Sequence, residues 1–359
     1  MKSALTAFFC LLNLAFVSAC ETDNDHRQSA SGNDLAHNGS ATDLQPSAAQ
    51  LQSGSWLTGG GDYQQAYYSP LEQINRKNVA ELGYAWHIDL PSEHGYEATP
   101  LMVDGVLYGS GPQGIAFAVD AASGQALWQF DPQIDPQFMR KVCCGVVNRG
   151  VAVSGGALFV AALDGYLFAL NKTDGTVLWR SDTFIDRNRG YTITGAPYIA
   201  NDLVIIGNAG AEFDARGYIT AYDMKTGKQR WRFFTVPSSP SPPFEHPELA
   251  VAAATWDPNS LWEVGLGGTV WDAMAFDPDL NLLYVGTGNA APYPRKLRSP
   301  SGGDNLYLAS ILAINPDTGQ LVWHYQTTPG DNWDFTATQK IILANLKIEG
   351  ITRQVLMQA

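Results

Sequence analysis

The sequence predicts an all-β protein, a β-propeller of four-stranded blades with a Trp-bearing repeat in each blade. Three observations predict this fold: a motif that recurs about every fifty residues, short alternating apolar runs joined by Gly-containing turns, and the composition. Of 359 residues, 35 are Gly and 10 are Trp, while only 16% are charged. Many short strands joined by tight turns produce such a profile.

The recurring motif is Ala, any residue, Asp or Asn, three residues, Gly, three residues and Trp. Its Asp or Asn can bond its own backbone in an Asx turn, and its Gly supplies a positive φ, so each copy predicts a hairpin. A fainter relative of the motif ends at Trp86. The full copies are AVDAASGQALW at 118–128, ALNKTDGTVLW at 169–179, AYDMKTGKQRW at 221–231 and AINPDTGQLVW at 313–323.

Another strand pair precedes most of these hairpins, as in residues 101–110, 152–170 and 201–208. Each repeat therefore predicts a four-stranded sheet. A sheet of about fifty residues cannot bury both faces alone, so the repeats must stack, and radial stacking gives a propeller. We expect the repeated Trp to be an apolar wedge between blades rather than a site residue.

The motif Trp residues are separated by 51, 52 and then 92 residues. The third interval indicates roughly forty inserted residues, a blade that lacks the motif, or both. Two Pro-rich stretches, 236–262 and 291–303, predict long loops, which on a rigid scaffold usually carry function. Two final strand-like runs, 341–348 and 353–359, predict the first half of a further blade. Because no later blade closes the ring, we expect an N-terminal portion of a longer product, truncated at the C-terminus.

The N-terminus predicts export. Lys2 precedes an apolar run at 4–17, and small residues at 18–19 precede Cys20. This pattern is typical of a signal peptide over residues 1–20, and the sequence before Cys20 resembles a lipobox. An ordinary secretory signal, with Cys20 incidental, is the alternative. Residues 21–54 are polar and predict a disordered tether. We expect a periplasmic protein with its propeller domain over 55–359, and lipid on Cys20 is the one membrane anchor that the sequence offers.

The net charge of −13 excludes a basic surface suited to nucleic acid. The adjacent Cys143 and Cys144 leave two possibilities. One is a strained vicinal disulfide, because neighbouring α-carbons lie about 3.8 Å apart while disulfides prefer about 5.5–6 Å. Such a bond closes almost no loop, so local shape or redox chemistry explains it better than stability. Two buried free thiols are the other possibility, and an exported compartment favours the bond.

Several stretches in order resemble quinoprotein alcohol dehydrogenases, and most closely the quinohaemoprotein ethanol dehydrogenases. The resemblance runs from about residue 55 to the end. It implies an eight-bladed propeller, incomplete here, that holds pyrroloquinoline quinone (PQQ) and Ca²⁺ near its axis. The stretches are CCGVVNRG (143–150), GAEFDARGYITAYD (210–223), TVWDAMAFDP (269–278), YVGTGN (284–289), RSPSGGDNLYLASILAINPDTG (298–319) and HYQTTPGDNWDFTATQ (324–339).

The resemblance also implies roles for individual residues. A Cys143–Cys144 disulfide covers one face of the quinone, and Trp271 stacks on the other. Asp334 is the catalytic base. The Ca²⁺ ligands are Glu212, Asn289 and Asp334, whose hard oxygen atoms suit this ion. The residues implied to hold the carboxylates and polar edge of PQQ are Glu97, Arg149, Thr194 and Thr269, with Ala209, Gly210 and Ala211 lining the approach to Glu212.

The implied reaction is PQQ- and Ca²⁺-dependent oxidation of an alcohol to an aldehyde or ketone. Ca²⁺ polarises the quinone C5 carbonyl, Asp334 takes the hydroxyl proton, and hydride passes to C5. Electrons then pass singly to a cytochrome c. The sequence contains no Cys-x-x-Cys-His, so haem c is expected only if a further domain follows residue 359.

Two other functions are compatible with the repeats. Exported lipoproteins with similar Trp-bearing blades act as non-enzymatic scaffolds for outer-membrane protein assembly. A quinoprotein acting on another substrate, such as polyvinyl alcohol or a sugar, is the second alternative. Singly, Glu212 could be a solvated turn carboxylate, Asn289 a turn residue and Asp334 a cap. Together with the Cys pair and Trp271 they favour the cofactor site, which a scaffold does not need.

Overall fold

The computed structural model describes residues 54–359 except residues 91, 137 and 143, and these described residues belong to one compact unit. The predicted signal peptide, Cys20 and nearly all of the predicted tether lie outside the described residues, so those assignments stay predictions. Among the described residues, no helix is long and apolar enough to cross a membrane.

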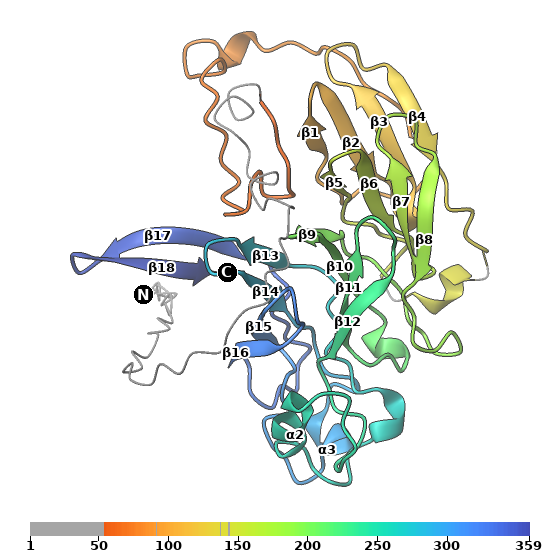
Figure 1. The fold of residues 1–359 in the computed structure, drawn as a ribbon, viewed down its shortest axis with the longest axis vertical. Coiled ribbons are helices and arrows are strands. Elements are labelled where there is room, and N and C mark those ends of the chain that lie inside the picture. The colour runs from red at the N-terminus through yellow and green to blue at the C-terminus, as the bar shows by residue number, and fades with distance from the viewer. Residues whose placement is uncertain (1–53, 91, 137, 143) are drawn as a thin grey trace, which may run out of the picture. The chain divides into compact units, whose positions relative to one another are not determined.

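The described chain forms four four-stranded antiparallel sheets and one two-stranded sheet, and strands adjacent in sequence pair in each (Figure 1). The first sheet comprises β1 (Leu101–Val103), β2 (Val106–Ser110), β3 (Ala116–Asp120) and β4 (Ala126–Phe130). The second comprises β5 (Ala152–Ser154), β6 (Ala157–Ala161), β7 (Tyr166–Asn171) and β8 (Val177–Asp182). The third comprises β9 (Tyr198–Ala200), β10 (Leu203–Gly207), β11 (Tyr218–Asp223) and β12 (Gln229–Phe234).

The fourth sheet comprises β13 (Met274–Asp277), β14 (Leu282–Gly286), β15 (Ser310–Ile314) and β16 (Leu321–Gln326). A hairpin of β17 (Ile342–Ile348) and β18 (Ile351–Met357) follows it. Within the described residues the α-helices are short, α2 (Glu248–Ala253) and α3 (Arg295–Arg298). The 3₁₀ helices are η2 (Val79–Glu81), η3 (Pro112–Gly114), η4 (Phe138–Lys141), η5 (Ala211–Phe213) and η6 (Trp262–Val264).

Each repeat motif forms the hairpin between the third and fourth strands of its sheet, as predicted. In the first copy, the Asp120 carboxylate accepts a hydrogen bond from the Ser123 amide at 2.8 Å. In the second copy, the Asn171 side-chain oxygen accepts the amide of Thr173, two residues on, at 2.8 Å, which is an Asx turn. The motif glycine, Gly124, has a φ of 74°. All four copies also have a register shift at the same place, next to the motif Ala. The motif therefore specifies both the turn and the local twist of the outer strand.

The motif Trp residues connect consecutive repeats, which confirms the predicted wedge. The indole nitrogen of Trp179 donates to the carbonyl oxygen of Met224, in the turn of the next repeat, at 2.9 Å. A side chain at Gly227 of that turn would place its Cβ 2.6 Å from the Trp179 ring, so glycine is required there. The same contact joins Trp86 to Ala121, Trp128 to Lys172 and Trp231 to Pro316.

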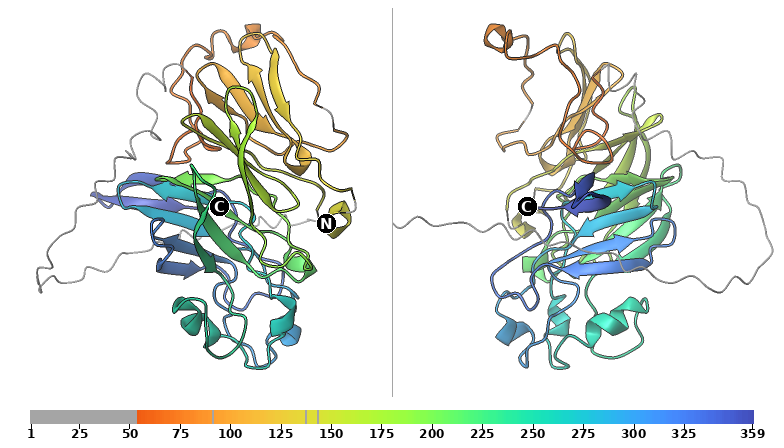
Figure 2. Two further views of the ribbon diagram at one scale, coloured as in Figure 1. Left: turned by 45° about the vertical axis from the view of Figure 1, so that its right-hand side comes forward. Right: turned by 90° about the vertical axis from the view of Figure 1, so that its left-hand side faces the viewer.

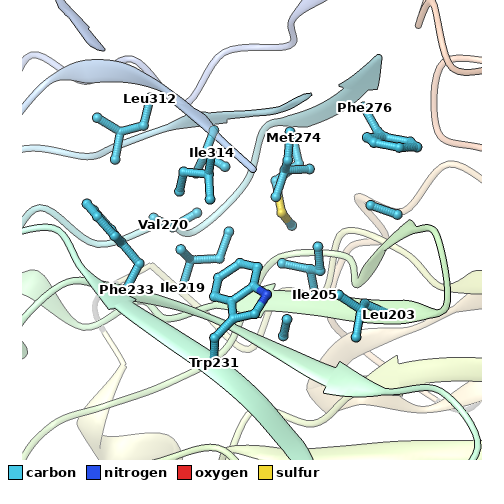
Figure 3. Close-up of a cluster of buried hydrophobic side chains, with 14 of the residues drawn as sticks. Leu203, Ile205, Ile219, Trp231, Phe233, Val270, Met274, Phe276, Leu312 and Ile314 are labelled. Atoms are coloured by element: carbon cyan, nitrogen blue, oxygen red, sulfur yellow. The ribbon is translucent and has the colours of Figure 1, made fainter. Parts of the chain in front are cut away.

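Apolar cores fill the space between consecutive sheets. The largest one contains Ile205, Ile219 and Phe233 from the third sheet, and Met274 and Leu312 from the fourth (Figure 3). Similar clusters join the first sheet to the second, the second to the third, and the fourth to the β17–β18 hairpin. Two further views show this succession of sheets (Figure 2). The sheets thus pack face to face in chain order, as blades of a propeller do.

The long interval before the last motif contains one blade with two long loops. Trp231 reaches the turn at Pro316 directly, so the third and fourth sheets are neighbours and no blade without the motif lies between them. The extra residues lie in the loop from 235 to 273, which contains α2, and in the loop from 287 to 309, which contains α3. These loops include both Pro-rich stretches.

Candidate functional site

The predicted site residues lie at one end of the blades. In an antiparallel meander the start of the first strand and the end of the second strand meet at the same end of the sheet. Arg149, Thr194 and Trp271 each lie shortly before the first strand of a sheet, and Glu212 and Asn289 shortly after a second strand. Glu97 likewise precedes β1. Strand direction therefore gathers side chains from four sheets at one end.

Arg149 is the centre of one group of predicted residues. Its Nη2 lies 3.2 Å from Oε2 of Glu97, and its Nη1 donates to the carbonyl oxygen of Thr194 at 3.3 Å. The guanidinium carbon lies 4.9 Å from the centre of the Trp271 ring. The Thr194 hydroxyl donates to the Trp271 carbonyl oxygen at 3.5 Å. Four residues from separate segments thus form a cationic position beside a flat aromatic face.

Close backbone packing holds the Trp271 ring in place. A Cβ at Gly288 would lie 3.0 Å from Nε1 of Trp271. A Cβ at Gly195 would lie 2.8 Å from the carbonyl oxygen of Trp271. Thr269 is buried, and its carbonyl oxygen accepts the Gly288 amide at 2.9 Å. The backbone of Thr269 therefore fixes the segment that carries Trp271. Its bond to Gly288 also links this segment to Asn289, the residue after Gly288.

Glu212 is the centre of the second group. It lies in η5, which starts after Gly210 (φ 100°) and ends at Asp214 (φ 64°). A Cβ at Gly210 would lie 2.1 Å from the Gly190 carbonyl oxygen, so only glycine fits there. Ala211 is buried, and Ala209 forms a β-bridge with Thr192. These neighbours fix the backbone that carries the Glu212 carboxylate.

Two donors converge on one oxygen of Glu212. Asn289 Nδ2 and the Tyr293 hydroxyl each donate to Glu212 Oε1 at 3.2 Å. Burial, followed by the charges of Glu212 and Asp334, raises the pKa of Tyr293 to about 12, so the phenol stays protonated at neutral pH. The charges of both predicted metal-binding carboxylates therefore act on one phenol.

Asp334 has an exposed side chain on a constrained backbone. Its φ is 79°, in the left-handed region. The buried Asp331 carboxylate accepts the amides of Trp333 at 3.0 Å and of both Asp334 and Phe335 at 3.2 Å, which holds the loop in this shape. Partial loss of solvation raises the pKa of Asp334 although its side chain is exposed, and the charges of Glu212 and Asp331 raise it further. A carboxylate beside another carboxylate is a position that a cation stabilises.

The donor set fits a hard divalent cation in part. Glu212 and Asp334 provide carboxylate oxygens, and turning the Asn289 amide would present its oxygen instead of Nδ2. Within the described residues, no group of three or more His, Cys, Asp or Glu is arranged to hold a metal ion. The candidate metal position therefore consists of two carboxylates and one amide.

Cys144 lies close to the Arg149 group. Cys144 and Glu97 line one hollow of about 210 Å³. The Cys144 sulfur is disulfide-bonded. Cys143 lies outside the described residues, so its pairing with Cys144 stays a prediction. Glu212 lines a second, more open hollow of about 470 Å³ together with Arg189 and Glu263.

Tyr293 is a site residue that no sequence motif marks. It lies in the second Pro-rich stretch, four residues after Asn289. The only sequence signal was the unusual length of this loop on a regular blade. A phenol in a loop has no motif of its own, so its contact with Glu212 became visible only in the structure.

Comparison with known proteins gives concordant results. Residues 56–359 match the family model described as "PQQ: Glucose/ethanol/alcohol dehydrogenase, beta-propeller domain". The quinohemoprotein alcohol dehydrogenase ADH IIB of Pseudomonas putida is 55% identical over 312 residues, which cover 87% of this chain and 45% of that protein. The chain thus spans less than half the length of this relative.

Two solved structures are similar to the chain over most of its length. The crystal structure of quinohemoprotein alcohol dehydrogenase from Comamonas testosteroni has a TM-score of 0.84 and 52% identity, covering 87% of this chain and 47% of that one. A europium-containing methanol dehydrogenase has a TM-score of 0.77 and 33% identity, covering 85% of this chain and 54% of that one. The repeats, the site residues and these similarities agree, and the chain belongs to the β-propeller family of PQQ-dependent glucose, ethanol and alcohol dehydrogenases.

Proposed function

We propose that this chain supplies the PQQ- and Ca²⁺-binding end of an enzyme that oxidises an alcohol to an aldehyde or ketone. The observation that carries the proposal is the meeting of Glu212, Asn289 and Asp334 at the same end of the blades as Arg149 and Trp271. Because the chain spans less than half of its curated relatives, the activity of the whole protein is part of the proposal.

The Arg149 group suits a flat, anionic cofactor. PQQ is a planar tricarboxylate, for which Trp271 offers an aromatic face and the Arg149 guanidinium offers charge-assisted hydrogen bonds. Glu97 fixes the guanidinium through its ion pair at 3.2 Å. The Cys144 side of the neighbouring hollow would cover the opposite face of the ring. When bound, PQQ supplies a two-electron acceptor and Ca²⁺ supplies a Lewis acid.

Asp334 is the proposed base that takes the hydroxyl proton of the alcohol. A general base must lie within hydrogen-bond reach of the proton that it takes, and the exposed Asp334 carboxylate beside Glu212 can be reached by an alcohol. Its exposed side chain stands between the exposed Trp333 and Phe335, which give an alcohol an apolar approach. Tyr293 and Asn289 hold Glu212 in place beside it.

The location and the electron acceptor belong to the same proposal. The signal-like segment at 1–20 supports export to the periplasm, with lipid attachment at Cys20. The Pseudomonas putida relative is named a quinohemoprotein, and this name indicates that it contains haem. We expect a cytochrome c to accept the electrons, whether free or in a further domain. The scaffold function is not favoured, because the family that matches consists of dehydrogenases.

The test is alcohol-dependent reduction of an artificial dye by the protein expressed from its complete gene, whatever its length. We expect activity only when both PQQ and Ca²⁺ are present. Asp334→Asn should lower the rate by about 10²–10⁴-fold while PQQ stays bound, because the substitution removes a general base. Asp279→Asn, an exposed turn residue away from the site, is the control. Activity without PQQ, or an unaffected Asp334→Asn enzyme, would contradict the proposal.

A further inference from the structure

Arg298 is a completely buried cation in the loop between β14 and β15. Its relative exposure is 0%, and it is the largest of the fully buried side chains in the described part of the chain. Burying a charge costs several kcal/mol even after relaxation, so a retained buried arginine needs compensating bonds. Burial lowers the pKa of Arg298 to about 10, so the guanidinium still carries its charge at neutral pH.

Every nitrogen of this guanidinium donates to a neutral oxygen. Nη1 donates to the carbonyl oxygens of Pro292 at 2.7 Å and Tyr293 at 2.8 Å. Nη2 donates to the Asp331 carbonyl oxygen at 2.7 Å and to Asn305 Oδ1 at 3.1 Å. Nε also donates to Asn305 Oδ1, at 3.2 Å. One rigid planar group thus joins three separate segments of the chain.

Two of these segments carry residues of the candidate site. The first contains Tyr293, whose hydroxyl donates to Glu212 Oε1 at 3.2 Å. The second begins at Asp331, whose carboxylate fixes the Asp334 amide at 3.2 Å. A continuous set of contacts therefore runs from the Arg298 guanidinium to both carboxylates of the candidate metal position. Arg298 itself is buried behind the site and touches neither carboxylate in the described contacts.

We propose that Arg298 is a positioning residue that sets the separation of Glu212 and Asp334 and thereby the affinity of the site for its divalent cation. This inference rests on the proposed function. Planarity is essential to the role, because a guanidinium presents its donors in a fixed fork in one plane. A lysine ammonium keeps the charge, but its three donors point in other directions. It therefore cannot hold all three segments in the same relative positions.

The test compares Arg298→Lys with Arg216→Lys in the protein expressed from its complete gene. Arg216 is a matched control, because it is also buried and also ties a long loop to the blade, donating to the Val236 carbonyl oxygen at 2.6 Å and to Glu245. Two quantities are measured for each variant: the thermal unfolding midpoint without ligands, and the Ca²⁺ concentration that half-saturates PQQ binding, followed by PQQ fluorescence.

We expect both variants to be destabilised, but only Arg298→Lys to raise the half-saturating Ca²⁺ concentration, by about 10–100-fold, as loss of residues that orient metal ligands does. Equal Ca²⁺ affinity in Arg298→Lys and wild type would overturn this inference alone. An equal loss in Arg216→Lys would overturn it too, because a general loosening would then explain the effect. A wild-type protein that does not bind PQQ and Ca²⁺ would overturn the proposed function itself.

Asn305→Gly provides a second route if Arg298→Lys does not fold. Asn305 has a φ of 56°, which glycine adopts readily, and its amide oxygen accepts two of the Arg298 bonds. Removing this oxygen frees one edge of the guanidinium while the backbone carbonyl acceptors remain. We expect a smaller rise in the half-saturating Ca²⁺ concentration, and an unchanged value would count against the inference.

Discussion

At the scale of single residues, the site depends on a loop that one buried carboxylate holds in shape. Asp331 accepts three consecutive backbone amides, and Asp334 follows in a left-handed conformation at φ 79°. An aspartate tolerates this conformation better than most residues, but at a cost that the Asp331 bonds offset. The hydrogen bonds of Asp331 therefore help to determine where the proposed base, Asp334, lies.

We expect Asp331→Ala to lower stability and activity together. Leaving these partly buried amides without their acceptor costs about 1–3 kcal/mol for each group that water does not reach. Chemical denaturation measures the loss of stability, and alcohol-dependent dye reduction measures the loss of activity. Asp277→Ala is the matched control, because Asp277 caps the amides of Asp279 and Leu280 in a turn away from the site. Equal activity loss in both variants would show that Asp331 has no particular role at the site.

Individual residues were predictable only where they resemble a family motif. Trp271, Glu212, Asn289 and Asp334 stand in quoted motifs, and the structure brings the last three together. Arg298 also stands in such a stretch, but its partners are mostly backbone carbonyl oxygens, which no sequence pattern reveals. Its role depends on three loops meeting at one point, which is a property of the fold.

At the scale of elements, the motif hairpin and its Trp determine how blades join. The indoles of Trp86, Trp128, Trp179 and Trp231 each donate to the turn of the next repeat and pack against the glycine of that turn. The motif thus provides both the Trp and the glycine of this contact. This regularity made the blades predictable from the sequence. The two long loops were located from the spacing, but their internal structure was not predictable. It depends on single contacts such as the Arg216–Glu245 ion pair.

We expect Trp231→Ala to cost about 3–5 kcal/mol in the free energy of unfolding, because it removes a large buried side chain between the third and fourth sheets. Urea denaturation followed by circular dichroism measures this cost. Trp333→Ala is the control, because the Trp333 side chain is 80% exposed and should change stability little. A Trp231→Ala protein as stable as wild type would disprove the wedge as a source of stability.

The loop before α2 should make stability depend on pH through His246. This ring stacks on Phe233 at 4.2 Å and bonds Glu248, and burial lowers its pKa below the ordinary 6.5. A lowered pKa means that the unfolded chain takes up a proton before the folded chain does. Stability from this group is therefore complete above pH 6.5 and is lost as the pH falls from there to the lowered pKa.

His246→Gln should flatten this part of the pH dependence, because glutamine keeps a polar side chain but does not titrate. Unfolding midpoints measured between pH 7.5 and pH 5 test the expectation. The exposed His87 provides the control substitution, His87→Gln. If wild type and His246→Gln lose stability in parallel on acidification, the dependence belongs to other groups.

At the scale of the whole molecule, strand direction explains why one end of the blades carries the site. Chain reversals place the residues before first strands and after second strands at the same end, whatever their identity. The repeats predicted this framework, and the family resemblance predicted which residues occupy it. Neither predicted that the Tyr293 hydroxyl donates to Glu212, because the loop that carries Tyr293 is an insertion into the repeat.

If one site binds PQQ and a divalent cation jointly, a titration with PQQ at zero and at saturating Ca²⁺ reveals it. Linkage requires that each ligand strengthen the other if both occupy one site. We predict that Ca²⁺ tightens PQQ binding to the wild-type protein and that Glu212→Gln removes most of this effect without preventing folding. PQQ binding that is absent, or that is the same with and without Ca²⁺ in both proteins, would contradict the account.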